Sequence, residues 1–111
     1  MNLSLKHKHA FVCGSTDGIG KASALLMAEY GCEITLIARN QEKLDSTLSE
    51  LAQNDDQNHS TVCADFDDPG MLKEKVNSQI STLGKPVDIL VNNSGGPHGG
   101  ALIEAEEDEF R

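Results

Sequence analysis

The sequence predicts an α/β fold in which helices cover both faces of a parallel sheet. Short apolar runs rich in β-branched residues alternate along the chain with segments whose apolar residues recur at helical spacing. A glycine-rich segment, Gly14–Gly20, joins the first apolar run to the first helical segment. This order is typical of βαβ units, and 111 residues lie within the size range of one small domain.

The first elements follow from these runs. We expect a first strand at about His9–Cys13 and a second strand at Cys32–Ile37. Lys6-His7-Lys8-His9 is interpreted as a solvated leading edge of the first strand. The helix between them ends at Gly31, which suits the position after a helix end. The stripe that this helix is expected to bury consists of Ile19, Ala22, Ser23, Leu26, Met27 and Tyr30.

The later elements carry clear start and stop signals. Asn40 is placed to cap a second helix, and Asp68 followed by Pro69 is placed to begin a third. The apolar residues of the two helices are Leu44, Leu48 and Leu51, and then Leu72, Val76, Ile80 and Leu83. Thr61–Ala64 is expected to form the third strand and Val87–Val91 a fourth, largely buried one.

Right-handed crossovers then imply the strand order 3-2-1-4, which is a partial doubly wound, or Rossmann, fold. The first two helices cover one face of this sheet, and the third helix covers the other. The carboxyl ends of strands 1 and 4 diverge where the order reverses, and we expect a ligand crevice there.

Three phosphate-binding motifs compete for the glycine-rich segment. Gly20 and Lys21 fit the end of a P-loop, but Ala22 replaces the hydroxyl that binds Mg²⁺. Gly18 and Gly20 fit the pattern G-x-G-x-x-G, but Ser23 stands at its third glycine. The pattern G-x-x-x-G-I-G is matched in full by Gly14, Gly18, Ile19 and Gly20. A turn of this kind presents backbone N–H groups to a phosphate at a helix N-terminus.

Arg39 follows the second strand, where a dinucleotide fold reads the adenosine ribose. A carboxylate there would bind a free 2′-hydroxyl, whereas an arginine offers a charged fork to a 2′-phosphate. No Asp or Glu occurs from Ile34 to Asn40. The sequence therefore favours NADP(H) over NAD(H).

Together with Asp65 after the third strand and Asn92-Asn93-Ser94-Gly95 after the fourth, these residues resemble the short-chain dehydrogenase/reductase family. The resemblance implies that Asp65 accepts a hydrogen bond from adenine and that the Asn-Asn-Ser-Gly segment lies along the cofactor ribose. Asp67 and Asp68 are interpreted as turn or cap residues. The predicted cofactor-binding residues are Gly14, Ser15, Thr16, Gly18, Ile19, Gly20, Arg39, Asp65, Asn92, Ser94 and Gly95.

The resemblance also implies hydride transfer to or from a carbonyl or alcohol carbon, for example that of a 3-oxoacyl thioester. The family uses a Ser and a Tyr-x-x-x-Lys pair for this chemistry, but Tyr30 is the only tyrosine and no such pair occurs. We therefore assign no catalytic residue and expect residues 1–111 to form an incomplete cofactor-binding domain. The alternative is a dinucleotide-binding module, or a truncated product, without activity.

The charge and the cysteine content limit the classes of partner that we expect for this chain. The net charge of −9 argues against nucleic acid and anionic membranes. The three cysteines have no metal-binding spacing and are interpreted as buried thiols of a reducing compartment, so a cytoplasmic location and no metal are expected. The resemblance implies a small carbonyl or alcohol substrate and a homo-oligomer for a full-length form.

Overall fold

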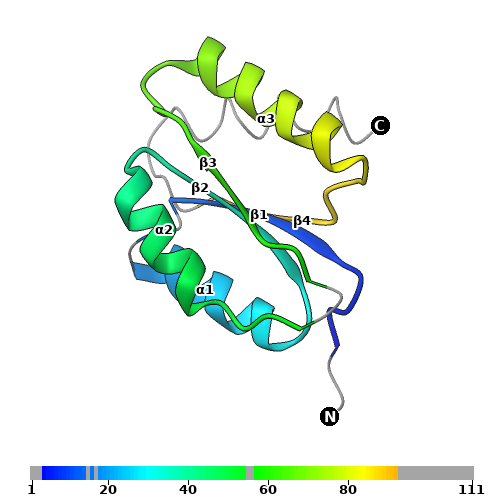
Figure 1. Ribbon diagram of the computed structural model, residues 1–111. Helices are drawn as coiled ribbons and strands as arrows, with labels where there is room; N and C mark the ends of the chain where they lie inside the picture. Colours follow the sequence, from blue (N-terminus) through cyan, green and yellow to red (C-terminus); the bar gives the residue numbers. More distant parts are fainter. Residues whose placement is uncertain (1–3, 15, 17, 55–56, 93–111) are drawn as a thin grey trace.

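The computed structural model describes residues 4–14, 16, 18–54 and 57–92, and these form a parallel sheet with helices on both faces (Figure 1). The strands are β1 (His9–Cys13), β2 (Glu33–Ala38), β3 (Ser60–Cys63) and β4 (Ile89–Asn92). The helices are α1 (Gly18–Glu29), α2 (Gln41–Glu50) and α3 (Pro69–Leu83). The strand order is β3-β2-β1-β4 with parallel neighbours, so the predicted fold class and the order 3-2-1-4 are confirmed.

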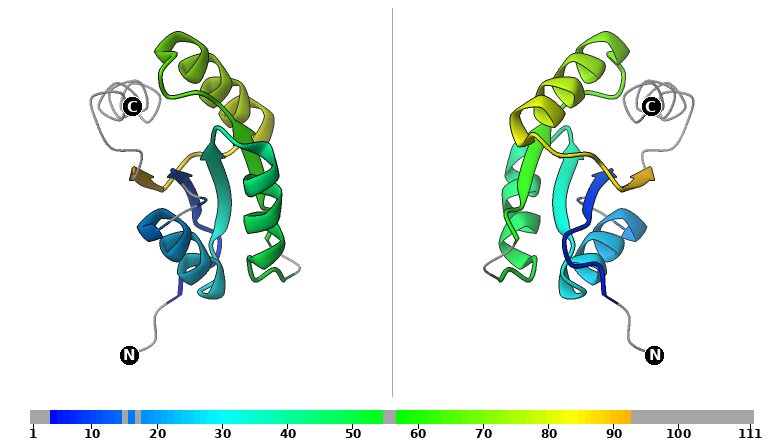
Figure 2. Two further views of the ribbon diagram at one scale, coloured as in Figure 1. Left: turned by 90° about the vertical axis from the view of Figure 1, so that its left-hand side faces the viewer. Right: turned by 90° about the vertical axis from the view of Figure 1, so that its right-hand side faces the viewer.

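The sheet separates two apolar clusters, one on each face. Successive residues of a strand point to opposite faces, so Ala10 and Val12 of β1 pack under α1 and α2 while Phe11 and Cys13 pack under α3. All four are fully buried, because β1 has a strand on either side and helices above and below. The side views in Figure 2 show α3 on one side of the twisted sheet and α1 and α2 on the other, as expected.

Helix α1 faces the sheet through its smallest residues. Gly20, Ala24 and Ala28 are its buried positions, and their small side chains let the helix axis approach the strands closely. The expected buried stripe is therefore wrong in its rotation: Ile19, Leu26 and Tyr30 are exposed, as is Ala22, while Ser23 and Met27 are half-buried. Apolar residues occur on both sides of this helix, so periodicity alone did not fix which side faces inward.

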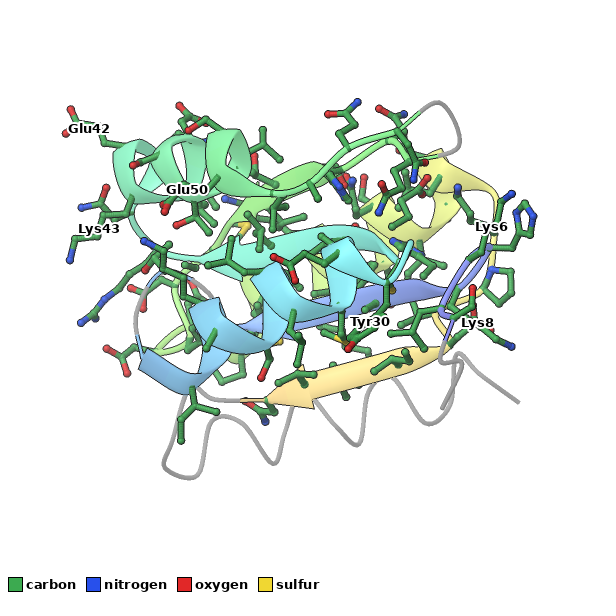
Figure 3. All side chains as sticks on the ribbon, turned by 90° about the horizontal axis from the view of Figure 1, so that it is seen from below. Lys6, Lys8, Tyr30, Glu42, Lys43 and Glu50 are labelled. Atoms are coloured by element: carbon green, nitrogen blue, oxygen red, sulfur yellow. The ribbon has the colours of Figure 1, made fainter. Side chains whose placement is uncertain are left out.

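The predicted caps of the later helices are confirmed. Asn40 Oδ1 accepts a hydrogen bond of 3.0 Å from the N–H of Lys43 at the start of α2. Asp68 Oδ1 accepts one of 3.2 Å from the N–H of Met71 at the start of α3. Beyond the cap, Glu42 and Lys43 lie at the exposed start of α2 (Figure 3), while Glu50 near its end pairs with Lys21 of α1.

A line of buried and partly buried hydrogen bonds connects the amino ends of the strands. His9 Nε2 lies 2.9 Å from Thr35 Oγ1, which lies 2.9 Å from Ser60 Oγ, and Gln79 Nε2 of α3 donates to the same Ser60 oxygen at 3.0 Å. His9 is only 1% exposed, so the expectation of a solvated leading edge is wrong for this residue. Its strand is central, and Asp88 already binds its backbone N–H at 3.0 Å.

Two further polar side chains fasten the start of β2. Glu33 accepts a hydrogen bond from the N–H of Asn58 on one carboxylate oxygen, and the ammonium of Lys85 lies against the other. Gln57 Nε2 donates to the carbonyl oxygens of Ala28 and Cys32 at 2.8 and 2.7 Å. The long loop before β3 is therefore tied to the end of α1 and the start of β2.

Strand β4 differs from the expected fourth strand in burial. Within the described residues it pairs with β1 alone, and Ile89–Asn92 are each half-buried rather than largely buried. Ile89 and Val91 pack against the cluster under α1 and α2, and Leu90 packs against the cluster under α3. An edge position leaves part of each side chain uncovered even where both faces carry apolar neighbours.

Candidate functional site

The carboxyl ends of the strands bring the predicted site residues to one edge of the sheet. Cys13 of β1 is in register with Ile37 on one side and with Asn92 on the other. The segments that follow β1 and β2, which begin with Gly14 and Arg39, therefore leave the sheet at the same end as Asn92. Asp65 follows β3 at this end, since Ala38 is in register with Cys63.

The turn between β1 and α1 has the backbone geometry that its glycines allow. Gly14 and Gly18 have φ angles of 69° and 57°, in the left-handed region that favours glycine. A Cβ built on Gly18 would meet no heavy atom within 4 Å, so the space above the first residue of α1 is open. Gly20 is buried against the sheet and Ile19 is exposed. The turn leaves room for a ligand group at the N-terminus of α1.

Not every predicted residue falls in the described part of the chain. Thr16 is half-buried within the turn. Ser15, Ser94 and Gly95 lie outside the described residues, as does Asn93.

Lys21, which fits the end of a P-loop, is held elsewhere. Its Nζ forms an ion pair of 2.8 Å with Glu50 Oε2 near the end of α2. A P-loop lysine reaches back to the phosphates at the start of its helix. This contact therefore disfavours the P-loop interpretation of the glycine-rich turn.

Arg39 leaves β2 with its side chain 73% exposed, and its Nη1 lies 3.9 Å from Asp67 Oδ2. The sequence interpretation gave Asp67 only a turn role, so this contact was missed. No local pattern in the sequence indicates this contact, because it depends on the register that brings the segments after β2 and β3 together. The guanidinium is thus open to solvent and to a ligand, with one carboxylate beside it.

Asp65 shapes the turn after β3. Its Oδ1 accepts a hydrogen bond of 2.9 Å from the N–H of Asp67, and its carbonyl oxygen accepts one of 3.1 Å from the N–H of Asp68. An aspartate that binds the backbone two residues on is a common turn arrangement. The carboxylate remains exposed at the carboxyl end of the sheet.

Two buried groups at the opposite end have shifted pKa values. Burial lowers the pKa of His9 from its ordinary value of 6.5, although the nearby carboxylates of Glu33 and Asp88 oppose this. Burial also raises the pKa of the Cys32 thiol to about 11. Of the other cysteines, Cys13 is buried as expected, whereas Cys63 is partly exposed. The shifted groups lie within the core rather than at the carboxyl end of the sheet.

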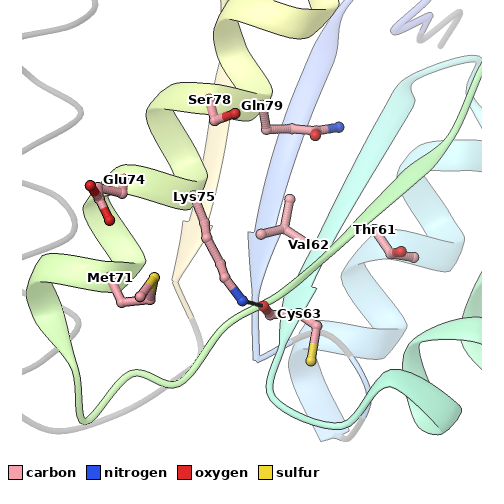
Figure 4. A pocket seen from close by; sticks show the side chains of 8 residues that line it. All are labelled: Thr61, Val62, Cys63, Met71, Glu74, Lys75, Ser78 and Gln79. Atoms are coloured by element: carbon pink, nitrogen blue, oxygen red, sulfur yellow. Dashed lines mark hydrogen bonds between the residues drawn. The ribbon is translucent and has the colours of Figure 1, made fainter.

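An open groove of about 610 Å³ lies between β3 and α3 (Figure 4). Lys75 crosses it, and its Nζ donates a hydrogen bond of 2.6 Å to the carbonyl oxygen of Cys63. Because β3 is an edge strand, this lysine covers a backbone acceptor that another strand could otherwise use. We interpret the groove as a protected sheet edge rather than as a ligand site.

Other classes of site find no support in the part of the chain that the structure describes. There, no group of three or more His, Cys, Asp or Glu side chains is arranged to hold a metal ion. No described helix is both long enough and apolar enough to cross a membrane.

Comparison with known sequences agrees with this geometry. The profile of the short chain dehydrogenase family matches residues 8–111. A probable 2,4-dienoyl-CoA reductase of Caenorhabditis elegans is 38% identical over 93 residues, which cover 84% of this chain and 30% of that protein. The human very-long-chain 3-oxoacyl-CoA reductase is 39% identical over 88 residues, which cover 78% of this chain and 27% of that protein. The chain thus spans about a third of the length of these relatives.

Solved structures show the same fold. L-sorbose reductase from Gluconobacter frateurii, in complex with NADPH and L-sorbose, superposes with a TM-score of 0.74 at 33% identity, over 86% of this chain and 36% of that one. An NAD⁺-bound xylitol dehydrogenase superposes with a TM-score of 0.84 at 21% identity, over 96% of this chain and 49% of that one. At this identity the likeness is one of fold alone.

Proposed function

Because the chain belongs to the short-chain dehydrogenase family, we propose that residues 1–111 form the cofactor-binding part of an NADP(H)-dependent oxidoreductase. The observation that carries the proposal is the open space above Gly18 at the N-terminus of α1, which leaves room for a phosphate group beside the backbone. The exposed guanidinium of Arg39, at the same end of the sheet, supports a ligand with a second phosphate. The net charge of −9 favours such a small ligand over a nucleic acid.

In this proposal each residue at the crevice has a separate task. The turn that contains Gly14, Gly18 and Gly20 holds the pyrophosphate through backbone N–H groups. Arg39 binds the 2′-phosphate, and Asp65 accepts a hydrogen bond from the adenine amino group. The remaining predicted contacts are Ser15, Thr16, Ile19, Asn92, Ser94 and Gly95.

The nicotinamide of a bound cofactor supplies hydride transfer to or from a carbonyl or hydroxyl carbon. The names of the relatives, which include a 3-oxoacyl-CoA reductase and a dienoyl-CoA reductase, support an acyl thioester as substrate. This chain contributes binding and orientation, because its 111 residues include no Tyr-x-x-x-Lys pair to move the proton.

Tyr30 favours a second candidate function, a dinucleotide-binding module without turnover. It is the only tyrosine, and it follows α1 at the end of the molecule remote from the crevice. Its carbonyl oxygen accepts a hydrogen bond of 2.8 Å from the N–H of Leu5, before β1. A hydroxyl in this place is far from any substrate bound at the carboxyl ends of the strands. The chain by itself would bind NADPH without consuming it.

A titration of the chain with NADPH and NADH, followed by nicotinamide fluorescence, tests the cofactor proposal. We expect NADPH to bind roughly tenfold more tightly, which corresponds to about 1.4 kcal/mol for a charge-assisted contact at an exposed guanidinium. Arg39→Ala should remove most of this difference. Lys73→Ala, which removes a positive charge from the exposed side of α3, should not. Equal affinity of the unaltered chain for both cofactors would contradict the preference.

A turnover assay then separates the two candidate functions. NADPH and a 3-oxoacyl thioester are incubated with the chain, and the absorbance of the reduced nicotinamide is followed. Binding without consumption supports the module, whereas consumption that depends on the chain supports an oxidoreductase in these residues and rules the module out.

A further inference from the structure

Arg39 and Asp67 face each other across the carboxyl ends of β2 and β3. Their side chains are 73% and 69% exposed, and Arg39 Nη1 lies 3.9 Å from Asp67 Oδ2. The register that pairs Ala38 with Cys63 brings the two following segments together. Cys63 Sγ also donates a hydrogen bond of 3.4 Å to the carbonyl oxygen of Arg39. The guanidinium therefore has a carboxylate neighbour supplied by the next strand.

The turn after β3 gives its three carboxylates different surroundings. Asp65 Oδ1 accepts the N–H of Asp67, and Asp68 Oδ1 caps α3 by accepting the N–H of Met71. Both of these carboxylates stabilise backbone. The carboxylate of Asp67 lies beside Arg39 instead, while the hydrogen bond from its backbone N–H to Asp65 fixes the backbone of the turn.

We propose that Asp67 is a specificity-determining residue, which competes with a 2′-phosphate for Arg39 and so weakens the preference for NADP(H). The inference rests on the proposed function, in which Arg39 binds that phosphate. An exposed ion pair is weak and is readily exchanged for another anion. A phosphate can take two hydrogen bonds from the guanidinium fork. To do so, the phosphate must displace the carboxylate of Asp67 from the guanidinium and remain close to that negative charge.

This arrangement affects the two cofactors differently. A ligand that carries the 2′-phosphate meets the competing carboxylate, whereas a ligand with a free 2′-hydroxyl brings no charge to this place. Removing the charge of Asp67 should strengthen binding of the phosphorylated ligand alone. Salt weakens the effect, because the Debye length is only about 3 Å at 1 M ionic strength.

Isothermal titration with adenosine 2′,5′-bisphosphate and adenosine 5′-monophosphate tests the competition. We expect Asp67→Asn to tighten the bisphosphate by about three- to tenfold and the monophosphate by less than about twofold. Glu74→Gln, which removes one negative charge from the exposed side of α3, is the matched control and should change neither affinity. In an Arg39→Ala background the gain from Asp67→Asn should shrink, because no guanidinium is left to compete for. Thermal unfolding should show the same midpoint for Asp67→Asn and the unaltered chain.

The outcomes separate this inference from the proposed function. If the unaltered chain prefers the bisphosphate and Asp67→Asn leaves that preference unchanged or lowers it, Asp67 does not compete and the cofactor site stands. Equal tightening of both nucleotides by Asp67→Asn overturns the competition too. If the unaltered chain binds neither nucleotide, the cofactor site itself is wrong, and the role of Asp67 is overturned with it.

Discussion

Polar side chains are buried at the amino end of the sheet and exposed at its carboxyl end. At the amino end, His9, Thr35 and Glu33 are buried, and hydrogen bonds or an ion pair hold them against neighbouring elements. At the carboxyl end, Arg39 and Asp65 are exposed, and the space above Gly18 is open. The same strands therefore begin in a buried polar network and end in groups that are available to a ligand.

This contrast predicts that residues at the amino end contribute to stability and residues at the carboxyl end to ligand binding. A buried hydrogen bond that loses one partner leaves the other desolvated, so substitutions at the amino end should lower the free energy of unfolding. A group that water already contacts can be removed at little cost to folding, so substitutions at the carboxyl end should alter binding. The comparison therefore predicts that matched substitutions at the two ends differ in whether they change ligand binding.

Two glycines provide the strongest test. Gly18 begins α1 at the carboxyl end, and Gly84 caps α3 near the amino end of β4; their φ angles are 57° and 65°. Neither would place a Cβ within 4 Å of another heavy atom. Asparagine tolerates this left-handed backbone better than other side chains. Gly18→Asn should weaken NADPH binding by about a hundredfold, because its side chain enters the pyrophosphate space.

Gly84→Asn is the matched control for this prediction. It carries a similar backbone cost, so thermal unfolding of the two variants should agree, while Gly84→Asn keeps the NADPH affinity of the unaltered chain. Loss of NADPH binding in both variants would mean that the substitutions disturb the fold rather than block the site. Retained binding in a folded Gly18→Asn protein would remove the glycine-rich turn from the site.

The next largest effect is expected in the buried network. Thr35→Val removes the hydroxyl that lies between His9 Nε2 and Ser60 Oγ, and it should lower the free energy of unfolding by about 1–3 kcal/mol. Thr61→Val makes the same change on the neighbouring strand, where the hydroxyl is half-buried and 3.4 Å from Gln41 Nε2, and should cost less than about 0.5 kcal/mol. Urea unfolding of both variants measures the difference. Equal losses would show that the network adds no particular stability.

The smallest effect is a dependence of stability on pH. Burial lowers the pKa of His9 in the folded chain, so the unfolded chain takes up a proton first as the pH falls. The stability due to neutral His9 is present above the ordinary pKa of 6.5 and is lost as the pH falls through 6.5 toward the lower folded value. Unfolding free energies measured across this window should decline less steeply in His9→Gln. An identical slope in both proteins would exclude His9 as the cause.

The order of elements, the strand order and the caps at Asn40 and Asp68 could be predicted, because each depends on local pattern and on the handedness of crossovers. The rotation of α1 could not, since its small inward residues and its apolar outward residues give no clear period. The burial of His9 was missed for a related reason. A polar residue at the start of a strand becomes buried only through its neighbours in the sheet, which a local pattern does not identify.

The position of part of the candidate site could be predicted, since the glycine-rich turn after β1 and Arg39 after β2 both lie at the carboxyl end of the sheet. That these residues bind phosphate groups stays a prediction. The contact between Arg39 and Asp67 was not predictable, because it depends on how two segments separated in sequence leave adjacent strands. Pairwise contacts across a sheet edge need the register, which the sequence alone did not provide.

The central claim, that the carboxyl end of the sheet binds a dinucleotide, is tested most directly by mapping amide chemical shifts of the isotope-labelled chain during titration with NADPH. The account predicts the largest changes at Gly14, Gly18, Gly20, Arg39 and Asp65, with Thr35, Ser60 and Gly84 at the amino end almost unchanged. Changes centred on the amino end or on the groove between β3 and α3, or no saturable change at any amide, would contradict it.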